Sequence, residues 1–285
     1  PVLADGTHGG TRTNYTVRVL ACSSGYTGGC KQYPNGKYKP VGLLHDYGEA
    51  DAMLFGLLTG SYDQNMAGGR LRKVVSSFKS EVDATTGQFT ASAEIVKTFD
   101  RLRIRDYNNA RTDNAYRAGW VTTRAPNSGE FVDWGNPIGE MLYEATRYFA
   151  GKKLATSAYA GTTTKDGEVG LSSATWDDPY DTSASAAKAP YCARGNLLAI
   201  SDTNVSYDSD QLPGVNSNFG SGISTDLTGL NVSTEADFIT ANEPSVPGLR
   251  FIGQVGSIFD SAPSPKSVSS LSSIRGLAPE EPTKQ

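Results

Sequence analysis

The chain alternates between short apolar runs and long segments rich in Gly, Ser, Thr, Asn and Asp, and this alternation limits the folds open to it. The apolar runs have the lengths of single strands and helices, whereas the polar segments are too long for ordinary connections. Strand-like and helix-like runs follow one another, which favours an α/β fold with a mostly parallel sheet flanked by helices. We therefore predict one helix-flanked sheet that carries long loop insertions.

Several apolar runs have the pattern of strands. Residues 14–21 (NYTVRVLA) alternate apolar and polar side chains, as a half-buried strand does. Residues 52–60 (AMLFGLLTG) and 196–202 (NLLAISD) are nearly continuous apolar runs, which fit strands buried on both faces. Residues 249–256 (LRFIGQVG) are the last predicted strand.

The clearest helix is predicted for residues 136–151. Asn136 is a favourable N-cap, Pro137 suits the first helical position, and Gly151 ends the helix. Its apolar residues form one stripe that we expect to face the core: Ile138, Met141, Leu142, Ala145, Tyr148 and Phe149. The charged residues Glu140, Glu144 and Arg147 lie elsewhere on the helix.

Two shorter helices are also predicted. One begins at Pro40 and ends at Gly48. The other covers residues 94–104, where Ile95, Phe99 and Leu102 recur at helical spacing.

The predicted domain covers residues 1–256, with a large insertion at about 61–135. Residues 257–285 are rich in Pro and Ser and are predicted to be a linker towards a further domain. Because the chain starts at Pro1 without a signal sequence, we expect a mature product or a fragment of a longer protein.

The charge balance argues against two classes of partner. The formal net charge is −4, and no Lys- or Arg-rich run supplies a local footprint for nucleic acid or for an anionic membrane surface. No apolar stretch is long enough to span a bilayer.

Cysteine usage indicates an oxidising compartment. Cys22 and Cys30 flank a flexible polar loop, SSGYTGG, and this spacing predicts a small disulfide-closed loop. The alternative is two unrelated thiols. Cys192 is left over, either free and buried or paired with a segment outside this chain.

Recognisable catalytic motifs are absent from the sequence. The two histidines, His8 and His45, suggest no dyad with a serine or with Cys192, so nucleophilic catalysis has no support. The phosphate-binding loop GxxxxGK[ST], HExxH and paired CxxC motifs do not occur, which makes zinc an unfavourable expectation.

One acidic segment has the pattern of a cation-binding loop. The run DTNVSYDSD places oxygen-bearing side chains at alternate positions after a predicted strand. Such ligands suit Ca²⁺ or Mg²⁺, so Asp202, Asn204, Asp208 and Asp210 are the predicted metal ligands. The alternative is a solvated turn. A second string, DTSAS at residues 181–185, follows no apolar strand and is attributed to chance.

Several longer strings occur in a characteristic order: KYKPVGLLHDYGEADAMLFGLLTGSY, GNPIGEMLYEATRYFAGKK, NLLAISDTNVSYDSDQLPG, FIGQVGSIFD and PSPK…RGLAPEEPTKQ. Together they resemble successive blocks of the PilC/PilY family of type IV pilus tip and biogenesis factors. The blocks span most of the chain. The resemblance places the chain in a von Willebrand factor A-like region upstream of a C-terminal β-propeller of the same polypeptide.

The family resemblance also implies a function. It implies an extracellular protein, exported through the periplasm to the pilus tip or outer cell surface. It implies roles in pilus assembly, adhesion to host-cell or abiotic surfaces, and twitching motility, with minor pilins of the tip complex as partners. We expect a non-catalytic module. The alternatives are a stand-alone metal-dependent binding domain and a secreted hydrolase that uses a carboxylate pair from WDDPYD or DTNVSYDSD.

Overall fold

The computed structural model describes residues 17–23, 25–104, 127–133, 135–181, 189–201, 205, 207–217, 220–243, 248–251, 254–255, 258–259 and 265–275. The α-helices are α1 (Leu43–Gly48), α2 (Glu94–Arg101), α3 (Ile138–Phe149), α4 (Thr164–Glu168) and α5 (Val232–Asn242). Short 3-10 helices are η1 (Phe78–Ser80), η2 (Ser157–Tyr159) and η3 (Leu271–Ser273). The strands are β1 (Cys30–Gln32), β2 (Tyr38–Pro40), β3 (Phe55–Thr59), β4 (Arg70–Ser76), β5 (Gly248–Phe251), β6 (Gln254–Val255), β7 (Ile258–Phe259), β8 (Pro265–Val268) and β9 (Ile274–Arg275).

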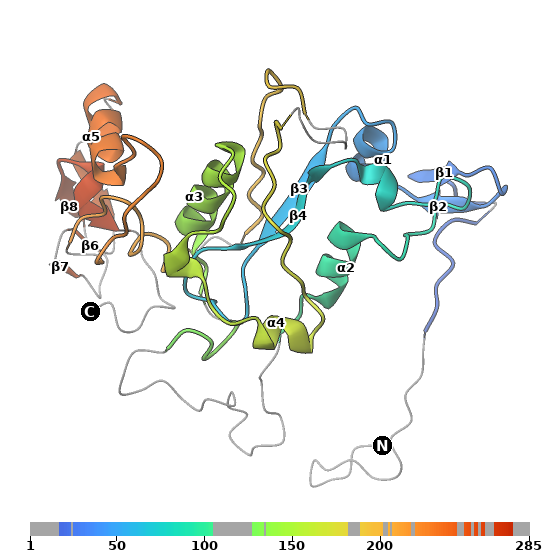
Figure 1. The fold of residues 1–285 in the computed structure, drawn as a ribbon, viewed down its shortest axis with the longest axis horizontal. Helices are drawn as coiled ribbons and strands as arrows, with labels where there is room; N and C mark the ends of the chain where they lie inside the picture. The colour runs from blue at the N-terminus through green and yellow to red at the C-terminus, as the bar shows by residue number, and fades with distance from the viewer. Residues whose placement is uncertain are drawn as a thin grey trace, which may run out of the picture.

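The centre of the fold is the antiparallel pair β3–β4, which lies between α3 on one side and α1 and α2 on the other (Figure 1). Successive residues of a strand point to opposite faces. Leu57 packs against the core cluster that includes Phe78, whereas Leu58 faces Gly69, where an added Cβ would also come 3.1 Å from Met141 of α3. The strand predicted for residues 52–60 is confirmed over Phe55–Thr59, and both of its faces are covered.

The core on the α1 and α2 side is built around Phe78, which is fully buried with Tyr33, Val82 and Ile95. Phe78 also explains where α1 ends. A Cβ at Gly48 would lie 2.5 Å from the Cβ of Phe78, so only glycine fits against this ring.

The three helices predicted from sequence are confirmed as α1, α2 and α3. The stripe predicted on α2 is wrong in part. Ile95 is buried, but Phe99 is 54% exposed and Leu102 is 37% exposed. The N-terminal half of α2 meets the core, and the C-terminal half extends past the short strand pair that it covers.

Two predicted strands are wrong in the residues that the structure describes. Residues 17–21 and 196–201 have no strand partner, and Val19 and Leu198 are 84% and 86% exposed. Apolar alternation supplies the side chains of a strand, but a strand also needs a neighbour for its main-chain groups. Residues 14–16 and 202 lie outside the described residues.

All strand pairs named among the described residues are antiparallel. A parallel contact is seen as a single bridge between Pro213 and Ile223. The mostly parallel, von Willebrand factor A-like sheet therefore stays a prediction.

The segment predicted as a large insertion, 61–135, supplies much of the core in its described part. It contains β4, η1 and α2, and it contributes the buried residues Phe78, Val82 and Ile95. Its long polar stretches concealed short elements that pair with β3.

The C-terminal part contains more regular structure than predicted. The strand predicted for residues 249–256 is divided into β5 and β6. The predicted linker from residue 257 holds β7, β8 and β9, of which β8 pairs with β5 and β9 pairs with β6. The Thr240 hydroxyl of α5 accepts a 2.9 Å hydrogen bond from the Leu271 N–H, which attaches α5 to η3. The domain boundary itself stays a prediction.

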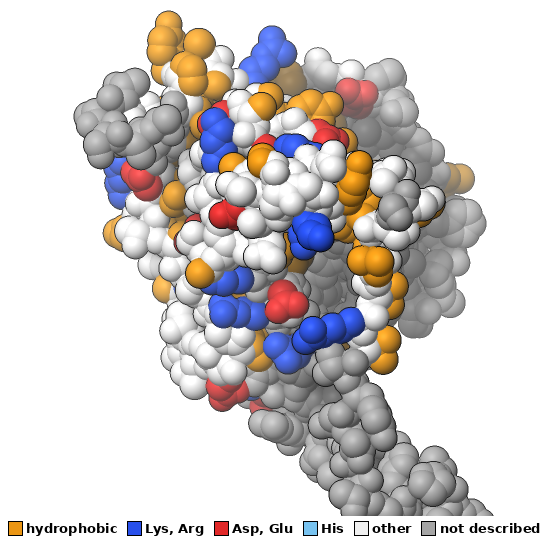
Figure 2. All heavy atoms as spheres, turned by 90° about the vertical axis from the view of Figure 1, so that its right-hand side faces the viewer, with side chains coloured by type: hydrophobic (Ala, Val, Ile, Leu, Met, Phe, Trp, Pro, Cys, Tyr) orange, Lys and Arg blue, Asp and Glu red, His pale blue; other side chains and the backbone are white. Residues whose placement is uncertain are grey.

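At the other end of the chain, β1 and β2 form a hairpin with Lys31 opposite Lys39. Cys22 and Cys30 form a disulfide, which confirms the predicted pairing, and Cys192 is exposed and free. Figure 2 shows the face that includes this end of the molecule, where basic, acidic and hydrophobic side chains are interspersed. No helix within the described ranges is long and apolar enough to cross a membrane.

Candidate functional site

The charged residues of α3 form the centre of the candidate site, because they point inward. Glu140 and Glu144 are fully buried and Arg147 is 6% exposed, whereas Leu142 of the predicted stripe is 40% exposed. The predicted orientation of α3 is therefore wrong. Glu140, Glu144 and Arg147 lie at helical spacings of four and three, so they share one face. Buried partners for that face outweigh its hydropathy.

Glu140 joins α3 to two loops. Its carboxyl oxygens accept hydrogen bonds from the Gly68 N–H at 2.7 Å and from the Gln211 N–H at 3.0 Å. Burial, together with the nearby Asp210 and Asp208 carboxylates, raises the pKa of Glu140 to about 8. Glu140 is therefore mostly protonated at neutral pH, which removes the penalty of a buried charge.

Glu144 and Arg147 form a second connection from α3. The Glu144 carboxylate accepts a 3.0 Å hydrogen bond from the Thr156 N–H and pairs with Arg147 at 2.9 Å. The Arg147 guanidinium also forms two parallel 2.9 Å hydrogen bonds to Asp226. These bonds to Asp226 raise the pKa of Arg147 above its ordinary value, and they lower the pKa of Asp226.

Arg147 also lies over an aromatic ring. Its guanidinium carbon is 5.4 Å from the ring centroid of Trp176, a cation–π distance. Trp176 belongs to the WDDPYD string, so this contact ties that string to α3. Asp178 of the same string accepts a 2.9 Å hydrogen bond from the Tyr180 N–H within its own turn.

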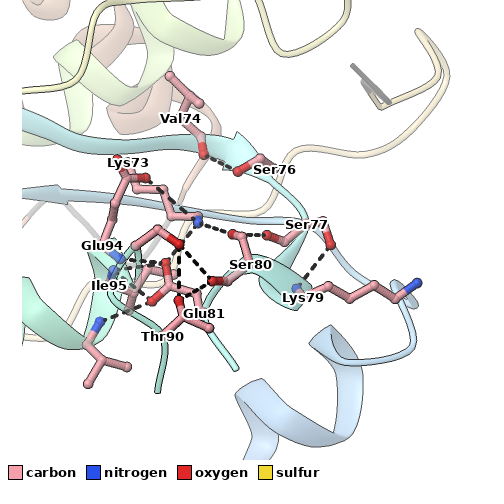
Figure 3. A network of polar contacts seen from close by, with 12 residues as sticks. Lys73, Val74, Ser76, Ser77, Lys79, Ser80, Glu81, Thr90, Glu94 and Ile95 are labelled. Atoms are coloured by element: carbon pink, nitrogen blue, oxygen red, sulfur yellow. Dashed lines mark hydrogen bonds and ion pairs between the residues drawn. The ribbon is translucent and has the colours of Figure 1, made fainter. Parts of the chain in front are cut away.

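A buried ion pair connects β4 to α2 (Figure 3). The Lys73 Nζ lies 2.8 Å from the Glu81 Oε1, with side-chain exposures of 2% and 0%. The Glu81 carboxylate also accepts hydrogen bonds from the N–H groups of Glu94 and Ile95 at 2.9 and 3.1 Å. These N–H groups belong to the first turn of α2, where a helix favours negative charge.

A polar network holds the loop that follows β3. Arg72 of β4 pairs with Asp166 of α4 at 2.8 Å, and both side chains are buried. The Asp166 carboxylate accepts hydrogen bonds from the Ser61 hydroxyl and the Tyr62 N–H, at 3.0 and 2.9 Å. The chain that leaves β3 is thereby fixed against α4.

Asp63 completes this network. Its carboxylate accepts hydrogen bonds from the Thr162 hydroxyl and from the N–H groups of Lys165 and Asp166. Burial opposes ionisation of Asp63, but these hydrogen bonds outweigh it and hold the pKa of Asp63 below its usual value.

The predicted metal ligands are only partly described. Asp202 and Asn204 lie outside the described residues, whereas Asp208 and Asp210 lie in the loop that Glu140 holds. Within the described part of the chain, no three His, Cys, Asp or Glu side chains gather closely enough to hold a metal ion. A Ca²⁺ or Mg²⁺ site therefore stays a prediction.

The site thus consists of buried charged clamps that fix irregular loops to a small scaffold. Sequence reasoning missed Glu140, Glu144, Lys73 and Glu81, because a charged side chain in a loop-rich chain is normally read as solvated. The signal available was the spacing of the α3 charges on one face.

These features define a loop-displaying domain, and its family follows from a match over most of its length. A family model described as the second domain of PilY1 homologs matches residues 55–285. The chain belongs to this PilY1 homolog family, which confirms the resemblance to PilC/PilY proteins.

A particular relative is the type IV pilus biogenesis factor PilY1 homolog of Xylella fastidiosa (strain Temecula1 / ATCC 700964). The two are 43% identical over 297 residues, which covers 97% of this chain and 20% of that protein. The chain therefore spans about a fifth of the length of this curated relative. No solved structure matches the chain.

Proposed function

We propose that this chain is an extracellular, non-catalytic region of a type IV pilus biogenesis factor that supports pilus assembly and surface adhesion at the pilus tip. The observation that carries the proposal is the 43% identity to a PilY1 homolog across 97% of the chain. The Cys22–Cys30 disulfide supports export, because disulfides persist in oxidising compartments.

The charged clamps support a role in display. Their buried groups bond to one another and to main-chain N–H groups, as Glu81 does to the first turn of α2. Residues used in this way hold loops in place, which suits binding to macromolecules through rigidly presented loops. Minor pilins of the tip complex and host-cell or abiotic surfaces are the proposed partners.

The fold proposal is a von Willebrand factor A-like domain that precedes a C-terminal β-propeller. The helices on both sides of β3–β4 support this arrangement. A Ca²⁺ or Mg²⁺ site at Asp202, Asn204, Asp208 and Asp210 belongs to the same proposal. Titration calorimetry with each cation tests it, and the expected result is binding that the double variant Asp208→Asn/Asp210→Asn loses.

The functional test is deletion of the gene in the source bacterium. We expect fewer surface pili by electron microscopy, weaker surface attachment and less twitching, with recovery when the gene is restored. Blocking pilus retraction in the same strain separates assembly from adhesion. If pili then return while attachment stays low, the protein acts in adhesion as well. Normal piliation together with normal attachment in the deletion strain would reject the proposal.

A further inference from the structure

Residues 195–201 run along α3 and are held at both ends. At one end, a Cβ on Gly195 would come 3.0 Å from ring carbons of Phe149, so the chain lies against this ring. At the other end, the Asn136 and Ser201 side chains are joined by hydrogen bonds of 2.8 and 3.1 Å. These contacts fix the two ends of the segment beside the two ends of α3.

The spacing of the two anchors makes the segment nearly fully extended. The helix α3 has 12 residues. A helix of this size is about 18 Å long, and six residue steps of an extended chain cover about 20 Å. The segment therefore has the conformation of a strand before any neighbour pairs with it.

The main chain of this segment has no neighbouring strand. Within the described part of the protein, no main-chain hydrogen bond joins residues 196–201 to another main-chain group. The Asn196 side chain bonds locally, to the Arg194 carbonyl. A row of free N–H and C=O groups on an extended segment is the template for pairing with another strand.

The side chains of the segment are exposed and apolar. Leu198 and Ile200 are 86% and 81% exposed, and Leu197 is 49% exposed. The segment also meets the apolar stripe of α3 at Phe149, and the stripe residue Leu142 is 40% exposed. Contiguous apolar exposure of this kind marks an interaction surface.

We propose that residues 196–201 form a preorganised edge for β-strand addition, which takes one extended strand from a partner protein. Only a strand supplies main-chain hydrogen bonds and alternating apolar side chains together. The incoming strand is uncharged at its facing positions, because residues 195–201 contain no charged side chain to complement one. This surface is separate from the charged clamps.

Hydrogen exchange measured by mass spectrometry on the full chain tests the proposal. The probe is a capped peptide in which three Thr-Val repeats lie between terminal lysines, which keep it soluble. A control peptide carries proline in place of the central valine. The Ala199→Pro variant removes one main-chain donor at an exposed position, and Ala199→Thr is the matched control because threonine is compatible with strand pairing.

With the Thr-Val peptide, we expect amide exchange at residues 197, 198 and 200 to slow by about tenfold in the wild type and in Ala199→Thr. We expect no slowing in Ala199→Pro or with the proline peptide. Equal slowing in Ala199→Pro would overturn the proposal, as would no slowing in the wild type. Slow exchange in the free monomer would overturn it in favour of pairing within the chain, and slowing that grows with protein concentration would show a second copy as the occupant.

Discussion

Lys73 of β4 and Glu81 form an ion pair at 2.8 Å in which both side chains are almost completely removed from water. Glu81 uses its remaining hydrogen-bonding capacity on the first turn of α2. One carboxylate therefore positions a lysine and a helix together, and this connection holds α2 against the central strand pair.

Removal of the lysine charge is expected to destabilise the protein strongly. Lys73→Met leaves the Glu81 carboxylate buried without its cation, and breaking such a pair costs about 3–5 kcal/mol. Lys79→Met is the matched control, because the Lys79 side chain is 58% exposed in its pair with Asp51. The measurement is urea unfolding followed by circular dichroism. A loss below about 1 kcal/mol for Lys73→Met would contradict the assigned role, since exposed pairs already reach that value.

Glu140 makes stability depend on pH in a defined direction. Its pKa is raised from the model value of 4.5 to about 8 in the folded protein. The folded state therefore holds a proton that the unfolded state releases between these values. The stabilisation is fully present below pH 4.5 and is lost as pH rises through about 8.

The test for Glu140 is urea unfolding from pH 5 to pH 9. Glu140→Gln keeps the shape of the protonated acid and cannot ionise, so we expect a flatter pH profile. The difference in slope between wild type and variant approaches about 1.4 kcal/mol per pH unit between the two pKa values. Parallel profiles for the two proteins would show that Glu140 does not carry this proton.

The Arg147 cluster is expected to be asymmetric towards mutation. Arg147→Met leaves the buried Glu144 carboxylate without its cation, and we expect a loss of about 3 kcal/mol. Asp226→Asn removes a carboxylate whose side chain is 47% exposed, so its loss should stay below about 1 kcal/mol. Thermal and urea unfolding of both variants measure the difference. Equal losses would mean that Glu144 does not depend on Arg147.

Gly68 occupies a position where only glycine fits. Its φ is +55°, and a Cβ there would lie 2.3 Å from the ring of Tyr159. Gly68→Ala must displace that ring and adopt an unfavourable backbone conformation, so we expect a loss of about 2–4 kcal/mol.

Gly60→Ala is the control for Gly68, because a Cβ at Gly60 would have no atom within 4 Å. Its effect should stay within about 0.5 kcal/mol, as for other substitutions away from special features. Similar unfolding midpoints for the two alanine variants would contradict the close packing of Gly68 on Tyr159.

The sequence by itself determined the local elements. The Pro137 start, the Gly151 stop and the 3.6-residue pattern fixed α3 within two residues of its observed ends. The polar loop between Cys22 and Cys30 was enough to predict their disulfide. Caps, periodicity and short loops are local properties, so they can be read without knowledge of the fold.

Only the tertiary structure decided which face of each element is buried and which extended runs gain a partner. In α3 it buried Glu140 and Glu144 because Gly68, Gln211, Thr156 and Arg147 arrive from distant parts of the chain to bond them. It left Leu198 and Ile200 exposed because no neighbouring main chain among the described residues reaches residues 196–201. Burial of a charge and pairing of a strand both require groups remote in sequence, and no local pattern encodes their arrival.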